Sequence, residues 1–166
     1  NSFKKLPKLI DSFMNQEYQK WKILFVDGKS TNKHKKFIKE YGKTDSRFKI
    51  IEDASHAIGA KYKQTLVGSC KYSDLTVFSF HPVKIITTGE GGAISTNNKK
   101  LAANINLLKN HGIVRKKNYW EYDIKELSAN YRLSDINCAL GIGQLNKIQN
   151  FVKVRKKEKM EYRLQF

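Results

Sequence analysis

Cysteine is scarce in this chain of 166 residues, which contains only Cys70 and Cys138. Neither lies in a Cys-x-x-Cys motif or beside a histidine cluster, so no metal site is predicted and reduced thiols in a cytoplasmic protein are the expected state. Long apolar runs are also missing, and no segment approaches the ~18 residues of a membrane span. The first residues are amphipathic without a continuous apolar core, so no secretory signal peptide is expected in them.

Acidic residues are few, with 15 Asp and Glu against 32 Lys and Arg and a net charge of +17. Such an excess raises the possibility of nucleic-acid binding. The excess charge, however, lies in residues 1–50 and 99–166, whereas residues 51–98 carry four basic and four acidic side chains and are neutral. The basic runs have helical spacing, which is typical of solvated helix faces. Nucleic acid is therefore not the expected partner.

The N-terminal part predicts alternating helices and strands. Apolar residues recur at helical spacing over residues 6–13, with Pro7 near the start, where a missing N–H is tolerated. An apolar strand is expected at residues 22–26. A second helix is expected over residues 33–41, with Gly42 at the usual C-terminal glycine position.

This part also carries a family resemblance, in the stretch SFKKLPKLIDSFMNQEYQKWKILFVDGKST. It resembles the start of the family 2 glycosyltransferases, in which a strand ending in an Asp-Asp-Gly-Ser-Thr turn holds the nucleotide of a sugar donor. Here the turn reads Asp27-Gly28-Lys29-Ser30-Thr31, with one acidic residue fewer and an inserted lysine. Sugar transfer by this chain is therefore not expected.

One lysine stands apart from the basic flanks, in the stretch SFHPVKIITTGEGGA. Lys84 follows residues 75–80, which read as a buried strand, and precedes Gly89, Gly91 and Gly92, which allow a close approach of the backbone. A lysine held there can act as an amine nucleophile and form a Schiff base with a substrate or with pyridoxal phosphate. The alternative is a structural lysine.

An acidic residue is predicted at a second strand end. Glu52 and Asp53 lie at the carboxyl end of the apolar strand 48–51, and ligands bind at such strand ends in open α/β sheets. The alternative is that Asp53 caps a turn or a helix, since residues 54–60 could start a helix. Taken with Lys84, Asp53 favours pyridoxal phosphate, which needs an amine for its aldehyde, an acid for its pyridine nitrogen and donors for its phosphate. Ser79 supplies a hydroxyl.

The motifs EDASHAIGAKY, VGSCKYSDLTVFSFHPVKIITTGEGGAIST, HGI and ELSANYRLSDINCALGIGQL occur in this order. They resemble the large domain of the DegT/DnrJ/EryC1/StrS sugar aminotransferases. The resemblance implies that Lys84 holds the cofactor and moves the proton, and that Asp53 pairs with the pyridine nitrogen. It also implies that His56 lies beside the ring near its phenolic oxygen and that Ser79 binds the phosphate. Asn130 is implied to reach the phosphate of a neighbouring subunit, so a homodimer is expected.

The expected fold is α/β. By resemblance, residues 51–166 are a partial large domain of a type I PLP-dependent aminotransferase, in which Ser134 caps a helix. Residues 1–50 are a partial nucleotide-sugar-binding α/β segment. Because the chain begins with Asn1 and lacks the family's upstream phosphate turn, stacking aromatic and small C-terminal domain, we expect a fusion of two partial genes.

The resemblance also implies an activity. Within the family, the sequence is most similar to enzymes that aminate a UDP-linked 4-keto-6-deoxy sugar in pseudaminic acid biosynthesis. The implied cofactor is pyridoxal 5′-phosphate, the implied substrate a UDP-linked keto sugar, and the implied amino donor glutamate. Two alternatives stay open: a non-catalytic fusion remnant and a nucleotide-sugar-binding glycosyltransferase fragment.

Overall fold

The computed structural model describes residues 5–17, 20, 22–27, 31–118 and 120–165. The elements are, in chain order, α1 (Leu6–Met14), β1 (Ile23–Asp27), α2 (Asn32–Thr44), β2 (Phe48–Asp53), β3 (Lys61–Tyr62), β4 (Thr65–Leu66), β5 (Leu75–Ser79), β6 (Gly92–Ser95), α3 (Lys99–Lys109), β7 (Ile113–Arg115), β8 (Tyr122–Ile124), α4 (Asp135–Leu145) and α5 (Ile148–Gln165). Within this described part, no helix is both long and apolar enough to cross a membrane.

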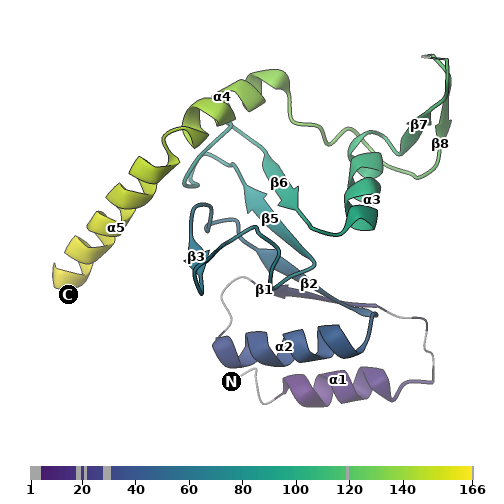
Figure 1. Cartoon of the computed structure of the whole chain (residues 1–166), viewed down its shortest axis with the longest axis horizontal. Coiled ribbons are helices and arrows are strands. Elements are labelled where there is room, and N and C mark those ends of the chain that lie inside the picture. The colour runs from purple at the N-terminus through teal and green to yellow at the C-terminus, as the bar shows by residue number, and fades with distance from the viewer. Residues whose placement is uncertain (1–4, 18–19, 21, 28–30, 119, 166) are drawn as a thin grey trace.

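A four-stranded sheet lies at the centre of the molecule, with the strand order β1-β2-β5-β6 (Figure 1). β1, β2 and β5 are parallel, and β6 is antiparallel to β5. Parallel strands end at the same edge of a sheet, so the residues that follow β2 and β5 lie along one edge. The α/β fold and the strands predicted near residues 22–26, 48–51 and 75–80 are confirmed.

The expected division between residues 1–50 and 51–166 falls inside β2. β1, from the first segment, pairs with β2 so that Ile23 faces Phe48 and Asp27 faces Glu52. β5, from the second segment, pairs with the other side of β2. The two segments therefore share one hydrogen-bonded sheet. Residues 28–30, which belong to the predicted glycosyltransferase-like turn, lie outside the described residues.

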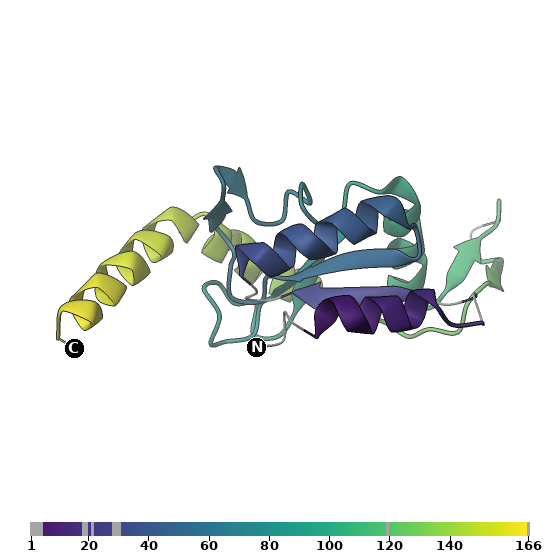
Figure 2. The same ribbon diagram turned by 90° about the horizontal axis from the view of Figure 1, so that it is seen from below.

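α1 and α2 lie beside the β1 edge of the sheet (Figures 1 and 2). α1 carries Pro7 in its first turn, as predicted, and buries Ile10 completely. α2 packs against β2 through Tyr41, whose ring centroid is 5.9 Å from that of Phe48. Phe48 is itself fully buried and stacks on Phe25 of β1 at 5.8 Å. Aromatic packing of this kind holds α2 on the sheet.

The prediction that Gly42 ends α2 is wrong. The helix continues to Thr44, so Gly42 lies within it. A Cβ atom at Gly42 would lie 3.3 Å from Cδ1 of Ile50 in β2, a tight contact. The glycine therefore allows the helix to approach the sheet closely instead of terminating it.

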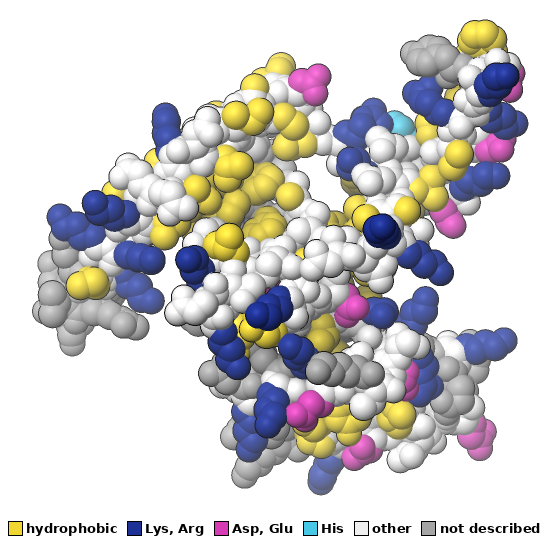
Figure 3. Space-filling view, in the orientation of Figure 1, with side chains coloured by type: hydrophobic (Ala, Val, Ile, Leu, Met, Phe, Trp, Pro, Cys, Tyr) yellow, Lys and Arg dark blue, Asp and Glu magenta, His cyan; other side chains and the backbone are white. Residues whose placement is uncertain are grey.

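α4 and α5 form an arm that extends away from the sheet (Figure 1). The predicted cap of this arm is confirmed, since Oγ of Ser134 accepts a hydrogen bond from the N–H of Asn137 at 3.2 Å. Figure 3 shows hydrophobic side chains gathered along the inner side of the arm. Its exposed apolar residues are Ile136, Leu140, Ile142, Leu145, Val154 and Met160. The arm thus leaves apolar surface uncovered by the described residues.

Candidate active site

Asp53 is the last residue of β2 and lies at the carboxyl edge of the sheet. Its Oδ1 accepts two hydrogen bonds from Ser55, one from the hydroxyl at 2.6 Å and one from the backbone N–H at 3.1 Å. These bonds, and to a smaller extent the charges of Lys84 and His56, hold the pKa of Asp53 below its ordinary value. The carboxylate is therefore ionised at neutral pH.

The alternative interpretation of Asp53 as a cap is correct in part. Residues 54–60 form no helix but two successive turns, in which Ala57 donates to the carbonyl of Ala54 and Ala60 donates to that of Ala57. Asp53 caps the first of these turns through Ser55. The charges of Lys84 and His56 also lower the pKa of this carboxylate. The cap and the site are therefore compatible.

Lys84 lies in the turn that follows β5. Its backbone N–H donates to the carbonyl of His81 at 2.9 Å, and its Nζ is 2.7 Å from Nε2 of His56. The side chain of Lys84 reaches back across the sheet edge toward the residues that follow β2. The amine of Lys84, the imidazole of His56 and the carboxylate of Asp53 are thus brought together, as the sequence predicts for two strand ends.

Ser79 is the last residue of β5 and pairs with Gly92 of β6. Its Oγ accepts a hydrogen bond from the backbone N–H of His81 at 3.4 Å, which leaves the hydroxyl proton for another acceptor. The glycines nearby are needed for close packing. A Cβ at Gly91, where φ is +151°, would lie 2.6 Å from Cδ1 of Leu133 and from Oγ1 of Thr88.

Asn130 is not brought to this group. It lies in the segment between β8 and α4, forms an isolated antiparallel bridge with Asn110, and is exposed. Its Oδ1 accepts from the backbone N–H of Arg132 at 3.1 Å. The described contacts of Asn130 thus run to α3 and its own segment, and its role stays a prediction.

The donor set fits pyridoxal phosphate. The group requires a primary amine, an ionised carboxylate and phosphate donors in one place. Lys84 provides the amine, Asp53 an acid whose pKa is lowered, and Ser79 a hydroxyl with its proton available. Among the described residues, no group of three or more His, Cys, Asp or Glu side chains could hold a metal ion.

Three residues around Lys84 were missed by the sequence reasoning. Nδ1 of His81 accepts from the N–H of Val83 at 3.3 Å, and its Nε2 lies 3.7 Å from Oε1 of Glu90. Nη2 of Arg155 in α5 donates to the carbonyl of Lys84 at 3.3 Å. The His-Pro-Val-Lys spacing gave a signal for the first contact. No local sequence pattern could have indicated the hydrogen bond from Arg155, because it joins residues 71 positions apart.

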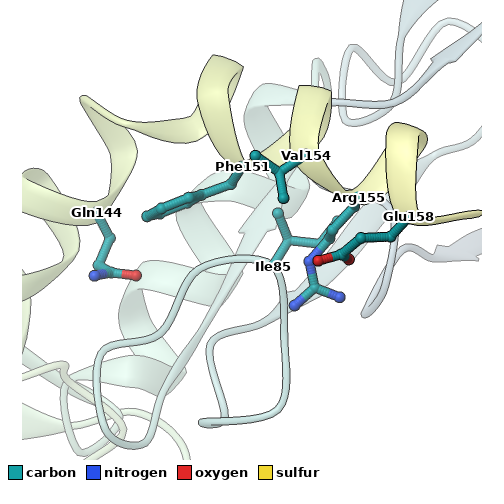
Figure 4. Close-up of a pocket in the computed structure, with 6 residues that line it drawn as sticks. All are labelled: Ile85, Gln144, Phe151, Val154, Arg155 and Glu158. Atoms are coloured by element: carbon teal, nitrogen blue, oxygen red, sulfur yellow. The ribbon is translucent and has the colours of Figure 1, made fainter.

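Arg155 also lines a pocket of about 370 Å³ between the Lys84 turn and the arm. In Figure 4, Ile85 points toward Val154, with Gln144 at one end of the pocket and Arg155 and Glu158 at the other. Phe151 completes the apolar lining. The backbone of Lys84 is thus held from the side of α5.

The model of the DegT/DnrJ/EryC1/StrS aminotransferase family matches residues 38–166. The model of glycosyl transferase family 2 matches residues 1–62. Both predicted resemblances are confirmed, and the two matches overlap over residues 38–62, which include all of β2.

Individual relatives match only part of their length. The UDP-4-amino-4,6-dideoxy-N-acetyl-beta-L-altrosamine transaminase of Campylobacter jejuni is 56% identical over 106 residues, which are 64% of this chain and 27% of that protein. The structure of Helicobacter pylori PseC, an aminotransferase involved in the biosynthesis of pseudoaminic acid, is 36% identical with a TM-score of 0.67. The match covers 82% of this chain and 36% of PseC. The PLP-form of a Streptococcus pneumoniae protein assigned as a sugar aminotransferase has 26% identity and a TM-score of 0.67, over 81% of this chain and 38% of that one. The chain thus spans about a quarter to two fifths of the length of these proteins.

Proposed function

Because this chain belongs to the DegT/DnrJ/EryC1/StrS aminotransferase family, we propose that it carries the lysine chemistry of a pyridoxal phosphate-dependent sugar aminotransferase. The observation that carries the proposal is the approach of Lys84 Nζ to within 2.7 Å of His56, beside the ionised Asp53. The amine and the acid come from two parallel strand ends, where a ligand can lie between them.

Each residue has a role that follows from its chemistry. Pyridoxal phosphate supplies an electron sink for the bonds at the carbon that carries the amino group. Asp53, ionised at neutral pH, is the group to keep the pyridine nitrogen protonated. Lys84 would hold the aldehyde of the bound group, and its amine is the group that would move the proton. His56 orients Lys84 through the contact between Nε2 and Nζ, and the hydroxyl of Ser79 would donate to the phosphate.

The substrate follows from the relatives. The Campylobacter jejuni relative is a transaminase of a UDP-linked amino sugar. We therefore propose a UDP-linked 4-keto-6-deoxy sugar as amino acceptor and glutamate as donor, so that the keto oxygen is replaced by an amino group while glutamate becomes 2-oxoglutarate. Asn130 would serve the phosphate of a partner subunit in a homodimer, and the cytoplasm is the proposed location.

The test is an absorbance scan of the purified chain with added pyridoxal phosphate. We expect a band near the edge of the visible range that Lys84→Ala lacks. Lys109→Ala, which removes a lysine from the end of α3, is the matched control and should keep the band. An equal band in Lys84→Ala, or none in the unmodified chain, would contradict the proposal.

A second candidate is a nucleotide-sugar-binding segment without transferase activity. It is favoured by the match of residues 1–62 to glycosyl transferase family 2 and by the place of β1, which ends opposite Glu52 at the same sheet edge as Asp53. Under this alternative UDP binds while pyridoxal phosphate does not. Isothermal calorimetry with UDP and with pyridoxal phosphate in parallel separates the two candidates.

A further inference from the structure

His81 makes four contacts within the segment that carries Lys84. Its backbone N–H donates to Oγ of Ser79 at 3.4 Å, and its carbonyl accepts from the N–H of Lys84 at 2.9 Å. Its Nδ1 accepts from the N–H of Val83 at 3.3 Å, and its Nε2 lies 3.7 Å from Oε1 of Glu90. His81 thus connects Ser79, Lys84 and the glycine turn, which comprises residues 89–92.

The contact with Val83 fixes the chemistry of the ring. An imidazole nitrogen accepts a hydrogen bond only when it bears no proton, so the Nδ1 contact selects the tautomer with its proton on Nε2. That nitrogen is the one that faces Glu90. The two functions of the ring are therefore separate: Nδ1 holds the backbone of the lysine turn, and Nε2 points toward the glycine turn.

Residues 81–83, which lead into Lys84, are exposed, and burial begins only at Ile86. The side chain of Val83 is 65% exposed, and those of His81 and Glu90 are 47% and 79% exposed. The contact of the neutral ring with Glu90 is long, at 3.7 Å, and exposed to water, so it contributes little. Ahead of Lys84, the hydrogen bonds of His81 and the fixed φ of Pro82 restrain the backbone, and Arg155 holds the carbonyl of Lys84 itself.

We infer that His81 is a positioning residue for Lys84, which acts by accepting the Val83 N–H and so fixes where the lysine amine lies. The inference rests on the proposed function of Lys84. The His81 ring is not placed among the reacting groups, and its effect passes through the backbone. Misplacement of a reacting group by about 1 Å can cost on the order of a hundredfold in rate, so a turn this exposed requires such a restraint.

The test measures the rate at which pyridoxal phosphate is incorporated at Lys84, trapped by borohydride and quantified by peptide mapping. Asparagine places an acceptor near the position of Nδ1, whereas glutamine reaches the position of Nε2. We expect His81→Ala and His81→Gln to label Lys84 about two- to tenfold more slowly, as for loss of one neutral hydrogen bond. His81→Asn should restore the rate to within about twofold of the unmodified chain.

The outcomes separate this inference from the proposed function. Absence of labelling at Lys84 in the unmodified chain would overturn both. Normal labelling in the unmodified chain with an equal rate in His81→Ala, or with His81→Asn as slow as His81→Gln, would overturn the inference alone. If His81→Ala does not fold, the Asn and Gln variants decide the question, provided that their thermal unfolding midpoints match.

Discussion

Nζ of Lys84 lies 2.7 Å from Nε2 of His56, although the two residues are 28 positions apart. This is a hydrogen-bonding distance, so the imidazole of His56 restrains the position of the Lys84 amine. The contact holds the amine toward Asp53 before any ligand arrives. Lys84 is thus held beside both an imidazole and a carboxylate.

Selective modification is the first expected outcome. Reduction of the pyridoxal phosphate adduct with borohydride should label Lys84 at near-stoichiometric level and leave the basic flanks unlabelled, because this lysine has an acid and an imidazole beside it at a strand end. Peptide mapping by mass spectrometry provides the measurement. In denaturant the label should spread over many lysines, and the same spread in the native chain would contradict the prediction.

Removal of the acid at the end of β2 should weaken retention of the cofactor. Asp53→Asn replaces an ionised carboxylate with a neutral amide, and hydrogen bonds to charged groups are worth about 1.5–3 kcal/mol. Retention should fall about tenfold to a hundredfold, and any half-reaction with glutamate should be lost. Labelling of Lys84 persists in the variant at high cofactor concentration.

The matched control for that change is Asp123→Asn, which removes an exposed carboxylate paired with Lys116 on the β7–β8 hairpin. Equilibrium dialysis measures retention in both variants. An unchanged half-reaction in Asp53→Asn would show that this residue only caps the turn at Ser55.

The pKa of Asp53 should respond to Ser55. The hydrogen bonds from Ser55 are the main cause of the lowered pKa, so Ser55→Ala should raise that pKa toward the ordinary value of about 3.9. Because the folded pKa lies below the unfolded one, the stabilisation from ionised Asp53 is present above about pH 4. It is lost as the pH falls through the folded value.

Carbon NMR titration of the Asp53 carboxyl measures this shift. Ser128→Ala, which removes a hydroxyl bonded to the carbonyl of Leu108, is the control and should leave the Asp53 titration in place. Identical titrations in Ser55→Ala and the unmodified chain would refute the assigned cause. Cofactor retention should be insensitive to Asp53 titration between pH 5 and 8.

Replacement of Gly91 and of Gly143 by alanine should change the free energy of unfolding differently. Gly91→Ala places a Cβ 2.6 Å from Leu133 and Thr88 at a φ of +151°, which should lower the free energy of unfolding by about 1–3 kcal/mol. Gly143→Ala lies in α4 with nothing within 4 Å. It should be neutral or raise stability by up to about 1 kcal/mol. Urea denaturation compares them, and equal losses would contradict the assignment.

Steady-state turnover by this chain alone is not expected. The side chains of Asp53 and His56 are both exposed, so a cofactor held there is open to water on one side. Incubation with pyridoxal phosphate, glutamate and a UDP-linked 4-keto sugar should form no more 2-oxoglutarate than Lys84→Ala does. Sustained formation above that control would mean that residues 1–50 complete the site.

Much of the fold and part of the site could be predicted from local patterns. Apolar runs gave the parallel strands, and strand ends gave Asp53 and Lys84, because side chains at the carboxyl ends of parallel strands meet at one edge. Ser134 was identifiable as a cap because Ser followed by Asp is a local signal.

The contacts that were missed depend on tertiary packing. The hydrogen bond from Arg155 to the carbonyl of Lys84 joins a helix to a turn 71 positions earlier, and no spacing rule reaches so far. Gly42 was misread for a related reason. Glycine ends many helices, but here it lies inside the helix, where a Cβ would come within 3.3 Å of the Ile50 side chain on β2.

β2 joins the two matched segments of the chain, and this has a consequence for how the molecule opens. β2 is hydrogen-bonded on one side to β1 and on the other to β5. Neither β1 nor β5 can therefore separate from the sheet without breaking hydrogen bonds of β2. Amide hydrogens of β1 and β5 should therefore exchange with solvent in a single cooperative event. A cut or an expression boundary between residues 50 and 51 would divide that strand and release Asp53 from its register.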